Sequence, residues 1–286
     1  MAKLLRWTGY SLAFVITLVL VAGAILWTIS SAELNARPQA KAEQLVRPTE
    51  AQLRDASRAA WTLGCFSCHG KDLRGSKVFD QPALGTIWAP NLTLVARHAS
   101  DEQLARAIRQ GIGADGRSLF VMPSEAFQHL SNEEVAALVA MIRSLPGGGS
   151  TTPPNHYGPL GRLGLALGKF RTAPDLVAGY AVQEPVFAGA QLERGRQLAI
   201  TRCSGCHGAD LRGKEVEPGT NSPDLTVAGA YELPAFLKLL RTGIPAGGQN
   251  LPMMGPTARS DLSHLDDGEI GALYDYLRAR AERVNS

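Results

Sequence analysis

Residues 65–75 read CFSCHGKDLRG, and residues 203–213 read CSGCHGADLRG. Both stretches share the pattern Cys-x-x-Cys-His-Gly, followed one residue later by Asp-Leu-Arg-Gly. The cysteines and the histidine of one copy lie 138 positions from those of the other, and all four cysteines of the chain belong to these two motifs. Because the flanks match as well as the cysteines, a chance repeat is a poor explanation, and the pattern predicts two similar units.

Cys-x-x-Cys-His is the attachment pattern of a c-type haem. Two thiols three positions apart add to the two vinyl groups of one porphyrin, and the adjacent imidazole reaches its iron. We therefore predict two covalently bound haem c groups, one for each motif. The predicted thioether residues are Cys65, Cys68, Cys203 and Cys206, and the predicted axial ligands from the motifs are His69 and His207.

Two other kinds of site use similar cysteine pairs. A redox dithiol of the thioredoxin type requires a βαβ pattern around Cys-x-x-Cys, and it gives no reason for a histidine at the next position. A zinc site uses paired Cys-x-x-Cys units, but here the pairs stand 138 residues apart, each inside its own repeat. Haem attachment explains the spacing better than either alternative.

The amino-terminal segment carries no charge over the 26 residues from Trp7 to Ala32. This length suits a membrane-spanning helix of about 20 residues and exceeds the 7–15-residue apolar core of a signal peptide. We predict residues 1–33 to be a transmembrane anchor. Cleavage after the small residues 30–32 is the alternative.

The charges around this segment predict its orientation. Lys3 and Arg6 precede the apolar stretch and Glu33 follows it, so the positive-inside rule places the amino terminus in the cytoplasm. The rest of the chain is then expected in the periplasm, with the protein a single-pass component of a bacterial inner membrane. The net charge of +3 includes those two cations, and no basic stripe indicates nucleic-acid binding.

The repeat extends beyond the two motifs and defines the domains. Residues 89–93 (APNLT) correspond to 222–226 (SPDLT), and 130–135 (LSNEEV) correspond to 265–270 (LDDGEI). The latter pair has the Ser or Asp cap and the acidic first turn that start a helix. The predicted segments are the anchor (1–33), a tether (34–49), a first domain (50–146), a linker (147–187) and a second domain (188–286). The linker is rich in Pro and Gly up to residue 159, and its apolar continuation 160–170 is expected to pack along a domain or at the bilayer surface.

An electron-transfer haem needs a second axial ligand opposite the histidine, and a thioether raises the potential relative to a second nitrogen. Met122 lies 53 residues after His69 in a loop ending at Pro123, and it is the predicted ligand of the first domain. Met141 is the other methionine there, on the apolar face of a predicted helix, where methionine is usually a core residue.

The second domain offers two neighbouring methionines for the same role. Alignment of Leu251 with Leu119 puts Met254 opposite Met122, so Met254 is predicted in preference to Met253. Coordination of an iron by two histidines, with His98 or His129 of the first domain as the second ligand, remains the structural alternative.

In these motifs the chain resembles the class I cytochrome c family twice over. The carriers of the resemblance are the Cys-x-x-Cys-His-Gly end of a first helix, the Arg-x-Gly segments at 109–111 and 241–243, and a Met loop before a terminal helix. The resemblance implies an all-α fold: one N-terminal transmembrane helix followed by two tandem class I cytochrome c domains.

The whole chain is similar to membrane-anchored dihaem cytochromes and to the cytochrome subunits of bacterial sugar and alcohol dehydrogenases. Those subunits usually carry three haem motifs and a carboxy-terminal anchor, whereas this chain has two motifs and an amino-terminal apolar segment. The resemblance implies an electron carrier and not an enzyme. Its donor is expected to be a periplasmic dehydrogenase or a quinol-oxidising complex, and its acceptor a terminal oxidase or soluble cytochrome.

The alternatives are a dihaem peroxidase, a thiol-ligated sulfur-oxidising haem and a gas or redox sensor. A peroxidase needs one haem with an open iron position, which two Met loops disfavour. The sulfur-oxidising type needs a spare cysteine, and none is present outside the two motifs. A sensor needs a signalling domain on the cytoplasmic side, and the chain shows no such domain.

The family also crosses its first and last helices closely, with a glycine against an aromatic ring. The second domain has Gly195 and Tyr276 at these places, whereas the first has Ser57 and Met141. Because a serine side chain blocks the closest approach, the sequence predicts a looser crossing in the first domain.

Overall fold

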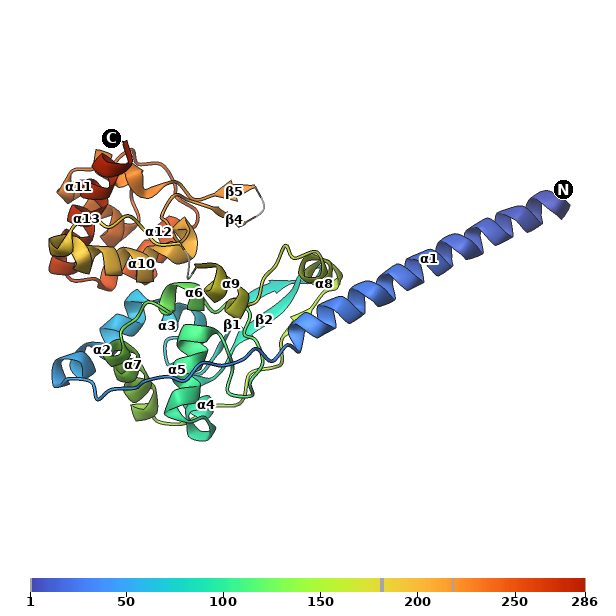
Figure 1. Cartoon of the computed structure of the whole chain (residues 1–286), viewed down its shortest axis with the longest axis horizontal. Coiled ribbons are helices and arrows are strands. Elements are labelled where there is room, and N and C mark those ends of the chain that lie inside the picture. Colours follow the sequence, from blue (N-terminus) through green and yellow to red (C-terminus); the bar gives the residue numbers. More distant parts are fainter. Residues whose placement is uncertain (1, 181–182, 218, 286) are drawn as a thin grey trace.

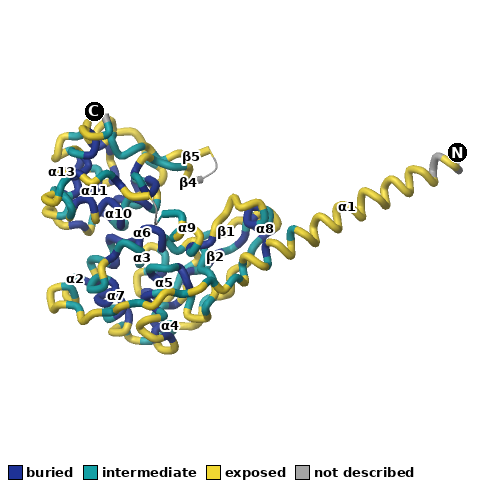
Figure 2. The backbone as a smooth tube through the Cα atoms, in the orientation of Figure 1, coloured by how far each residue is buried: buried dark blue, intermediate teal, exposed yellow. Residues whose placement is uncertain are grey.

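The computed structural model describes residues 2–180, 183–217 and 219–285. Met1 of the predicted anchor, residues 181–182 of the predicted linker, and Pro218 and Ser286 of the second domain lie outside these ranges. A single long helix, α1 (Ala2–Leu34), projects from a body of shorter helices (Figure 1). Its part from Arg6 to Leu34 is long and apolar enough to cross a membrane. Almost all of α1 is exposed (Figure 2).

The first domain is a bundle of short helices around one apolar core. Ser100 and Ser131 begin two of these helices with reciprocal capping boxes, which confirms the helix start predicted at 131. Gly111, with φ of 65°, ends the helix that Ser100 begins. The helices are α2 (Glu50–Thr62), α3 (Cys65–His69), α4 (Leu92–His98), α5 (Asp101–Gln110), α6 (Ser124–Phe127) and α7 (Asn132–Ser144).

The second domain repeats this arrangement with a separate core. Asp266 and Glu269 form the same reciprocal cap at the start of its last helix, and Gly243, with φ of 72°, ends the helix that corresponds to α5. Its helices are η1 (Ala190–Leu192), α10 (Glu193–His207), η2 (Leu225–Ala230), α11 (Leu233–Thr242), α12 (Met254–Ser260), η3 (Leu262–His264) and α13 (Asp267–Asn285).

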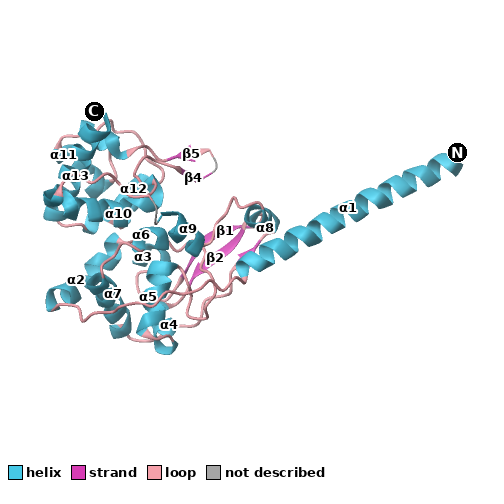
Figure 3. Cartoon of the chain, viewed as in Figure 1, coloured by secondary structure: helices cyan, strands magenta, loops and turns pink. Residues whose placement is uncertain are grey.

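The prediction of an all-α fold needs a correction, because two small sheets accompany the helices (Figure 3). The segment from the motif's last glycine to the proline that accepts from the motif histidine is five residues longer in the first domain, Gly75–Pro90, than in the second, Gly213–Pro223. The longer segment contains β-branched and aromatic residues, which favour strands. It forms the hairpin β1 (Ser76–Gln81) and β2 (Gly85–Ala89), joined by β3 (His156–Tyr157). The described residues of the second domain form the shorter pair β4 (Glu215–Glu217) and β5 (Thr220–Asn221).

The segments predicted as tether and linker lie against the first domain. Glu43 of the tether pairs with Arg109 of α5 at 3.0 Å, and its side chain is 4% exposed. The segment 147–187 contains β3, α8 (Pro159–Ala166) and α9 (Ala173–Tyr180). The helix α9 packs on α5 and α6, and Gln128 at the end of α6 donates to the Val177 carbonyl at 3.2 Å. These residues therefore extend the first domain instead of forming a free spacer.

Candidate functional site

The helices that carry the two motifs differ in the backbone that precedes the first cysteine. In the second domain α10 runs unbroken through Cys203, Cys206 and His207. In the first domain α2 ends at Thr62, and a turn at Gly64, with φ of 74°, precedes the short helix α3 that carries Cys65. Glycine is needed at such a position because other residues rarely adopt positive φ. The sequences match around the cysteines, but the backbone before them does not.

Each motif histidine is held by a proline carbonyl. The Nδ1 of His69 donates to the Pro90 oxygen at 2.9 Å, and the Nδ1 of His207 donates to the Pro223 oxygen at 2.9 Å. A carbonyl can only accept, so Nδ1 carries the proton and Nε2 keeps a free lone pair, as a metal-ligating imidazole requires. The sequence comparison matched the 89–93 and 222–226 segments but did not predict that their prolines accept from the motif histidines. The presence of a proline at the same place in both repeats was the signal that could have indicated this role.

The Asp-Leu-Arg-Gly part of the repeat forms the turn that closes each motif. Leu73 and Leu211 are fully buried and have φ of 56° and 62°, an unusual conformation for leucine that occurs at the same place in both domains. The backbone N–H of Gly75 donates a hydrogen bond to the His69 carbonyl at 2.8 Å. A Cβ on Gly75 would lie 2.9 Å from the Ala89 oxygen. This repeated geometry brings the 89–93 segment against the motif histidine.

The four cysteines form no disulfide with one another. Burial raises the pKa of Cys65 and of Cys203 to about 12 each, so both are neutral at pH 7. Reactive dithiols and zinc sites need thiolates, whose pKa is lowered by their surroundings. Within the described residues, no cluster of three or more His, Cys, Asp or Glu side chains is arranged to hold a metal ion. Buried, neutral thiols disfavour a reactive dithiol at either motif.

The predicted methionines lie against the same cores as the motif cysteines. Met122 and Cys65 both pack on the core of the first domain, and Met254 and Cys203 both pack on that of the second. Met253 is instead an exposed side chain at the surface. In each domain one motif cysteine and the predicted methionine thus pack on the apolar core, and the second cysteine and the histidine belong to the same motif helix. This arrangement suits a covalently attached haem with His and Met ligands.

The other histidines are placed less favourably as ligands. His98, His156 and His264 are exposed. His129 is half-buried, and burial is the main cause that lowers its pKa, with Arg196 acting in the same direction against Glu184. Both of these charged residues belong to the segment leading into and forming α10. His129 therefore faces the second domain, at the boundary between the two.

The crossing of first and last helices also differs from the prediction. A Cβ on Gly195 would lie 2.0 Å from the Ala272 oxygen and 2.7 Å from the Tyr276 Cβ, so only glycine fits this crossing. Ser57 is exposed and cannot block the crossing in the first domain. Ala56 is buried beside it, at 2% exposed. The position inferred by counting back from Cys65 was wrong because the turn at Gly64 interrupts the helix there.

The two domains meet through their motif helices. Ser67, between the first pair of cysteines, donates a hydrogen bond to Asp261 at the end of α12. Gly205, between the second pair, faces Pro123, since a Cβ there would lie 3.9 Å from the Pro123 Cβ. Each Cys-x-x-Cys-His helix therefore contacts the segment that follows the predicted methionine of the other domain. This reciprocal contact brings the two candidate sites to one interface.

Aromatic and charged residues complete this interface. The ring of Trp61 in α2 stacks between Phe66 (4.3 Å between centroids) and His264 of the second domain (4.7 Å). Arg58 of α2 donates to Glu269 at 2.5 Å and to the His264 carbonyl at 3.2 Å. The hydrogen bonds from Glu269 first, and then from Asp55, raise the pKa of Arg58 above its ordinary value.

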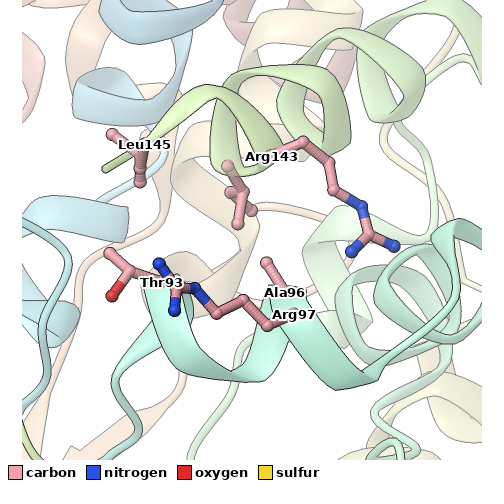
Figure 4. Close-up of a pocket in the computed structure, with 6 residues that line it drawn as sticks. Thr93, Ala96, Arg97, Arg143 and Leu145 are labelled. Atoms are coloured by element: carbon pink, nitrogen blue, oxygen red, sulfur yellow. The ribbon is translucent and has the colours of Figure 1, made fainter. Parts of the chain in front are cut away.

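Each domain also has a small surface pocket between its last helix and the helix after the proline. The pocket of the first domain has a volume of 310 Å³, and Figure 4 shows Thr93, Ala96 and Arg97 of α4 facing Arg143 and Leu145. The pocket of the second domain has a volume of 330 Å³ and is lined by corresponding residues of η2 and α13. No cysteine, histidine or methionine lines either pocket, so both lie apart from the candidate site.

Comparison with known families identifies both domains. Residues 192–281 match the family described as cytochrome c, and residues 53–142 match the family described as cytochrome c oxidase, cbb3-type, subunit III. Both matches contain one Cys-x-x-Cys-His motif and its predicted methionine.

Two characterised proteins resemble most of the chain. A fructose dehydrogenase cytochrome subunit from Gluconobacter japonicus is 26% identical over 84% of this chain and 56% of its own length. One of the subunits of nicotinate dehydrogenase from Pseudomonas putida is 27% identical over 79% of this chain and 21% of its own length. The chain thus spans about half of the first relative and about a fifth of the second.

Proposed function

The chain carries two cytochrome c domains, and from this premise we propose that it is a membrane-anchored dihaem electron carrier of the bacterial periplasm. It takes electrons from a dehydrogenase and passes them to an oxidase or a soluble cytochrome. The single observation that carries the proposal is the duplicated site, in which each domain packs one cysteine of its Cys-x-x-Cys-His helix and one half-buried methionine on an apolar core.

In this proposal the two haem c groups are held by Cys65 with Cys68 and by Cys203 with Cys206. When bound, each haem supplies an iron that takes up and releases one electron. His69 and Met122 are the axial ligands in the first domain, and His207 and Met254 in the second. The core position of Met254 and the exposed position of Met253 favour Met254.

The protein's own residues set the conditions for this chemistry. The hydrogen bonds from Nδ1 to the Pro90 and Pro223 carbonyls fix the imidazole orientation and increase its basicity toward iron. A thioether opposite the imidazole favours the reduced state and raises the potential. His69 with Met122 and His207 with Met254 would together hold each iron and leave no position for a substrate, so the domains would carry electrons without bond chemistry.

The reciprocal contact between the domains supports electron exchange within the chain. Each motif helix lies against the segment after the other domain's methionine. The two helices that carry the haem-attachment cysteines therefore lie at the same interface. An electron received by one domain then has a direct route to the other through packed protein. The second domain, the first domain, or both can serve as the docking side for a partner.

The relatives support a dehydrogenase as the donor. Both are named as parts of dehydrogenases, one acting with fructose and the other with nicotinate. We propose that this chain is the electron-transfer subunit of a dehydrogenase for a small organic substrate, held beside it at the outer face of the inner membrane by α1.

The first test is the mass of the purified full-length chain from a bacterium that matures c-type cytochromes. The proposal expects the polypeptide mass plus two haem groups, and plus one haem in the double variant Cys65→Ser/Cys68→Ser. A chain that carries fewer than two haems would contradict it. For the donor, the tagged chain should co-purify with a dehydrogenase from its native membranes, and the substrate of that enzyme should reduce both haems. Failure of this second experiment alone would remove the dehydrogenase partner and leave the dihaem carrier.

A further inference from the structure

The helix α8, within the segment predicted as a linker, is fixed to the anchor helix. The guanidinium carbon of Arg162 lies 3.6 Å from the centre of the Trp27 ring. Its Nη1 donates to the Ser30 hydroxyl at 3.0 Å and to the Ser31 hydroxyl at 3.1 Å. Ser30 is fully buried, in a helix that is otherwise almost entirely exposed (Figure 2). The contact therefore ties α8 to one particular level of α1.

That level coincides with the expected outer boundary of the membrane. Trp7 and Trp27 stand 20 positions apart, which is about 30 Å along a helix and equals the thickness of a bilayer's hydrocarbon core. Tryptophan rings favour the two boundaries of that core. If Trp7 and Trp27 mark these boundaries, Arg162 and the helix that carries it lie at the level of the outer headgroups.

One face of α8 and of the residue that follows it is apolar, with Leu160 and Leu167 exposed and Leu163 half-buried. Successive helical residues are about 100° apart, so Leu160, Leu163 and Leu167 form a single stripe. Leu160 is 53% exposed and Leu167 is 61% exposed. The opposite side is buried in the first domain, since Leu165 is 4% exposed and a Cβ on Gly161 would lie 2.1 Å from the Leu84 oxygen.

The arrangement of the helices indicates what faces this stripe. Figure 1 shows α8 nearly end-on beside the foot of α1, with the domains on one side and the rest of α1 extending away on the other. Around α8, the buried side faces the domain, and the side of Arg162 faces α1. The leucine stripe lies opposite the buried side, so it faces the direction in which α1 continues. In a membrane-anchored chain that direction is the bilayer.

We propose that α8 is an interfacial helix whose leucine stripe is immersed in the outer leaflet of the membrane that α1 crosses. Just beyond its end, Lys169 and Arg171 are exposed, where their charges meet lipid phosphates. An amphipathic helix with apolar residues on one face and cations beside it lies in the plane of the interface in this way. The proposal rests on α1 serving as an uncleaved anchor, which is part of the proposed function.

This second membrane contact fixes the orientation of the first domain. The segment 34–49 already packs on the first domain through Glu43 and Arg109, and α8 adds a second fixed point. The helix α8 joins the domain through its buried face and joins α1 through Arg162, so anchor, bilayer and domain become one unit. A membrane-bound donor then meets the carrier in one orientation.

The experiment uses the full-length holoprotein in vesicles of phosphatidylethanolamine and phosphatidylglycerol. The native cysteines are occupied by thioethers, so a nitroxide label on Leu167→Cys reports that position alone. The haems are kept ferric, and their constant contribution to the relaxation of the label is measured without either reagent and subtracted. The label's accessibility to oxygen, which concentrates in the bilayer, is compared with its accessibility to a water-soluble nickel chelate. Val19→Cys inside α1 and Val227→Cys, at a position 48% exposed in the second domain, serve as bilayer and water references.

The proposal expects the label at 167 to favour oxygen as the label at 19 does, while the label at 227 favours nickel. A label at 167 that matches 227, with 19 in the bilayer, would overturn the interfacial helix and leave the anchor intact. A label at 167 shielded from both reagents would assign the stripe to a protein partner and also overturn it. A label at 19 that favours nickel would overturn the anchor itself.

A second variant tests the contact with α1. Arg162→Gln removes the cation from the Trp27 ring and should raise nickel access at position 167 several-fold. Arg117→Gln, at a position whose side chain is 52% exposed on the first domain, should leave it unchanged. Unchanged access in Arg162→Gln would show that this contact does not hold the helix in place.

Discussion

Arg58 of the first domain and Glu269 of the second form a bidentate ion pair, with N–O distances of 2.5 and 3.2 Å. The Glu269 side chain is 12% exposed and that of Arg58 is 31% exposed. Arg58 is also held by both oxygens of Asp55, at 2.6 and 2.7 Å. Asp55 therefore holds the Arg58 guanidinium in place for Glu269. The ion pair joins the two domains beside their motif helices.

Removing this pair should loosen the domains. Arg58→Met is expected to lower the stability of the interface by about 1–2 kcal/mol, because a charged hydrogen bond is lost at a partly buried site. Thermal unfolding followed by Soret circular dichroism should then separate into two transitions. Arg54→Met, on the same helix with a side chain 73% exposed, is the control. Equal unfolding of both variants would contradict the role assigned to Arg58.

The axial methionines are tested by absorption. Met122→Ala and Met254→Ala should each remove half of the weak red band that arises from sulfur bound to ferric haem iron. Met141→Ala and Met253→Ala should retain the whole band, since these residues are predicted as core and surface side chains. Loss of the band in Met253→Ala, with retention in Met254→Ala, would reverse the assignment in the second domain.

Gly195→Ala tests the helix crossing. The added Cβ would lie 2.0 Å from the Ala272 oxygen, and such overpacking costs about 2–3 kcal/mol of unfolding free energy. Gly271→Ala on α13 is the matched control, because nothing lies within 4 Å of its Cβ position. It should be neutral or stabilise the helix by up to about 1 kcal/mol. Denaturant unfolding measures both, and an unchanged midpoint in Gly195→Ala would show that the crossing opens without cost.

Glu125 predicts a pH dependence of stability. It is 5% exposed and one carboxyl oxygen has no hydrogen-bond partner. Burial raises its pKa, against a smaller lowering by its own backbone amide and by Lys214. Because the folded state holds this proton more strongly than the unfolded state, the contribution is fully present below the ordinary glutamate pKa. It is lost as the pH rises through the raised folded value.

Glu125→Gln keeps the shape and removes the titration, so the decline of unfolding free energy over that pH window should flatten. Glu102→Gln, at an exposed position of α5, should keep the wild-type decline. The measurement is urea unfolding at a series of pH values. A decline that persists unchanged in Glu125→Gln would assign it to another group.

The repeat made much of this architecture predictable. Cys-x-x-Cys-His with equal flanks located both motifs, and the Ser131 and Asp266 caps located the last helices. The family comparisons confirm two cytochrome c domains. Local patterns served well here because capping and turn chemistry depend on neighbouring residues.

Features that depend on tertiary contacts were missed. Ser57 was assigned to a crossing by counting from Cys65, but the turn at Gly64 shifts the register of α2. The sheet β1–β2–β3 needs residues from the supposed linker, whose pairing with Gly85 no local pattern reveals. The contact of Ser67 with Asp261 joins positions 194 residues apart. The first two features depend on packing within the first domain, and the third depends on the docking of the two domains. Neither kind of contact is encoded at short range in a single sequence.

The central claim is that both haems are closed electron-transfer centres, and carbon monoxide tests it most directly. The fully reduced dihaem chain should titrate in two one-electron steps, and neither haem should bind carbon monoxide within minutes at neutral pH. Met254→Ala should bind it rapidly at one haem, which shows that the assay detects an open position. Rapid binding to one haem of the unaltered protein, accompanied by turnover of hydrogen peroxide, would contradict the carrier and indicate a dihaem peroxidase.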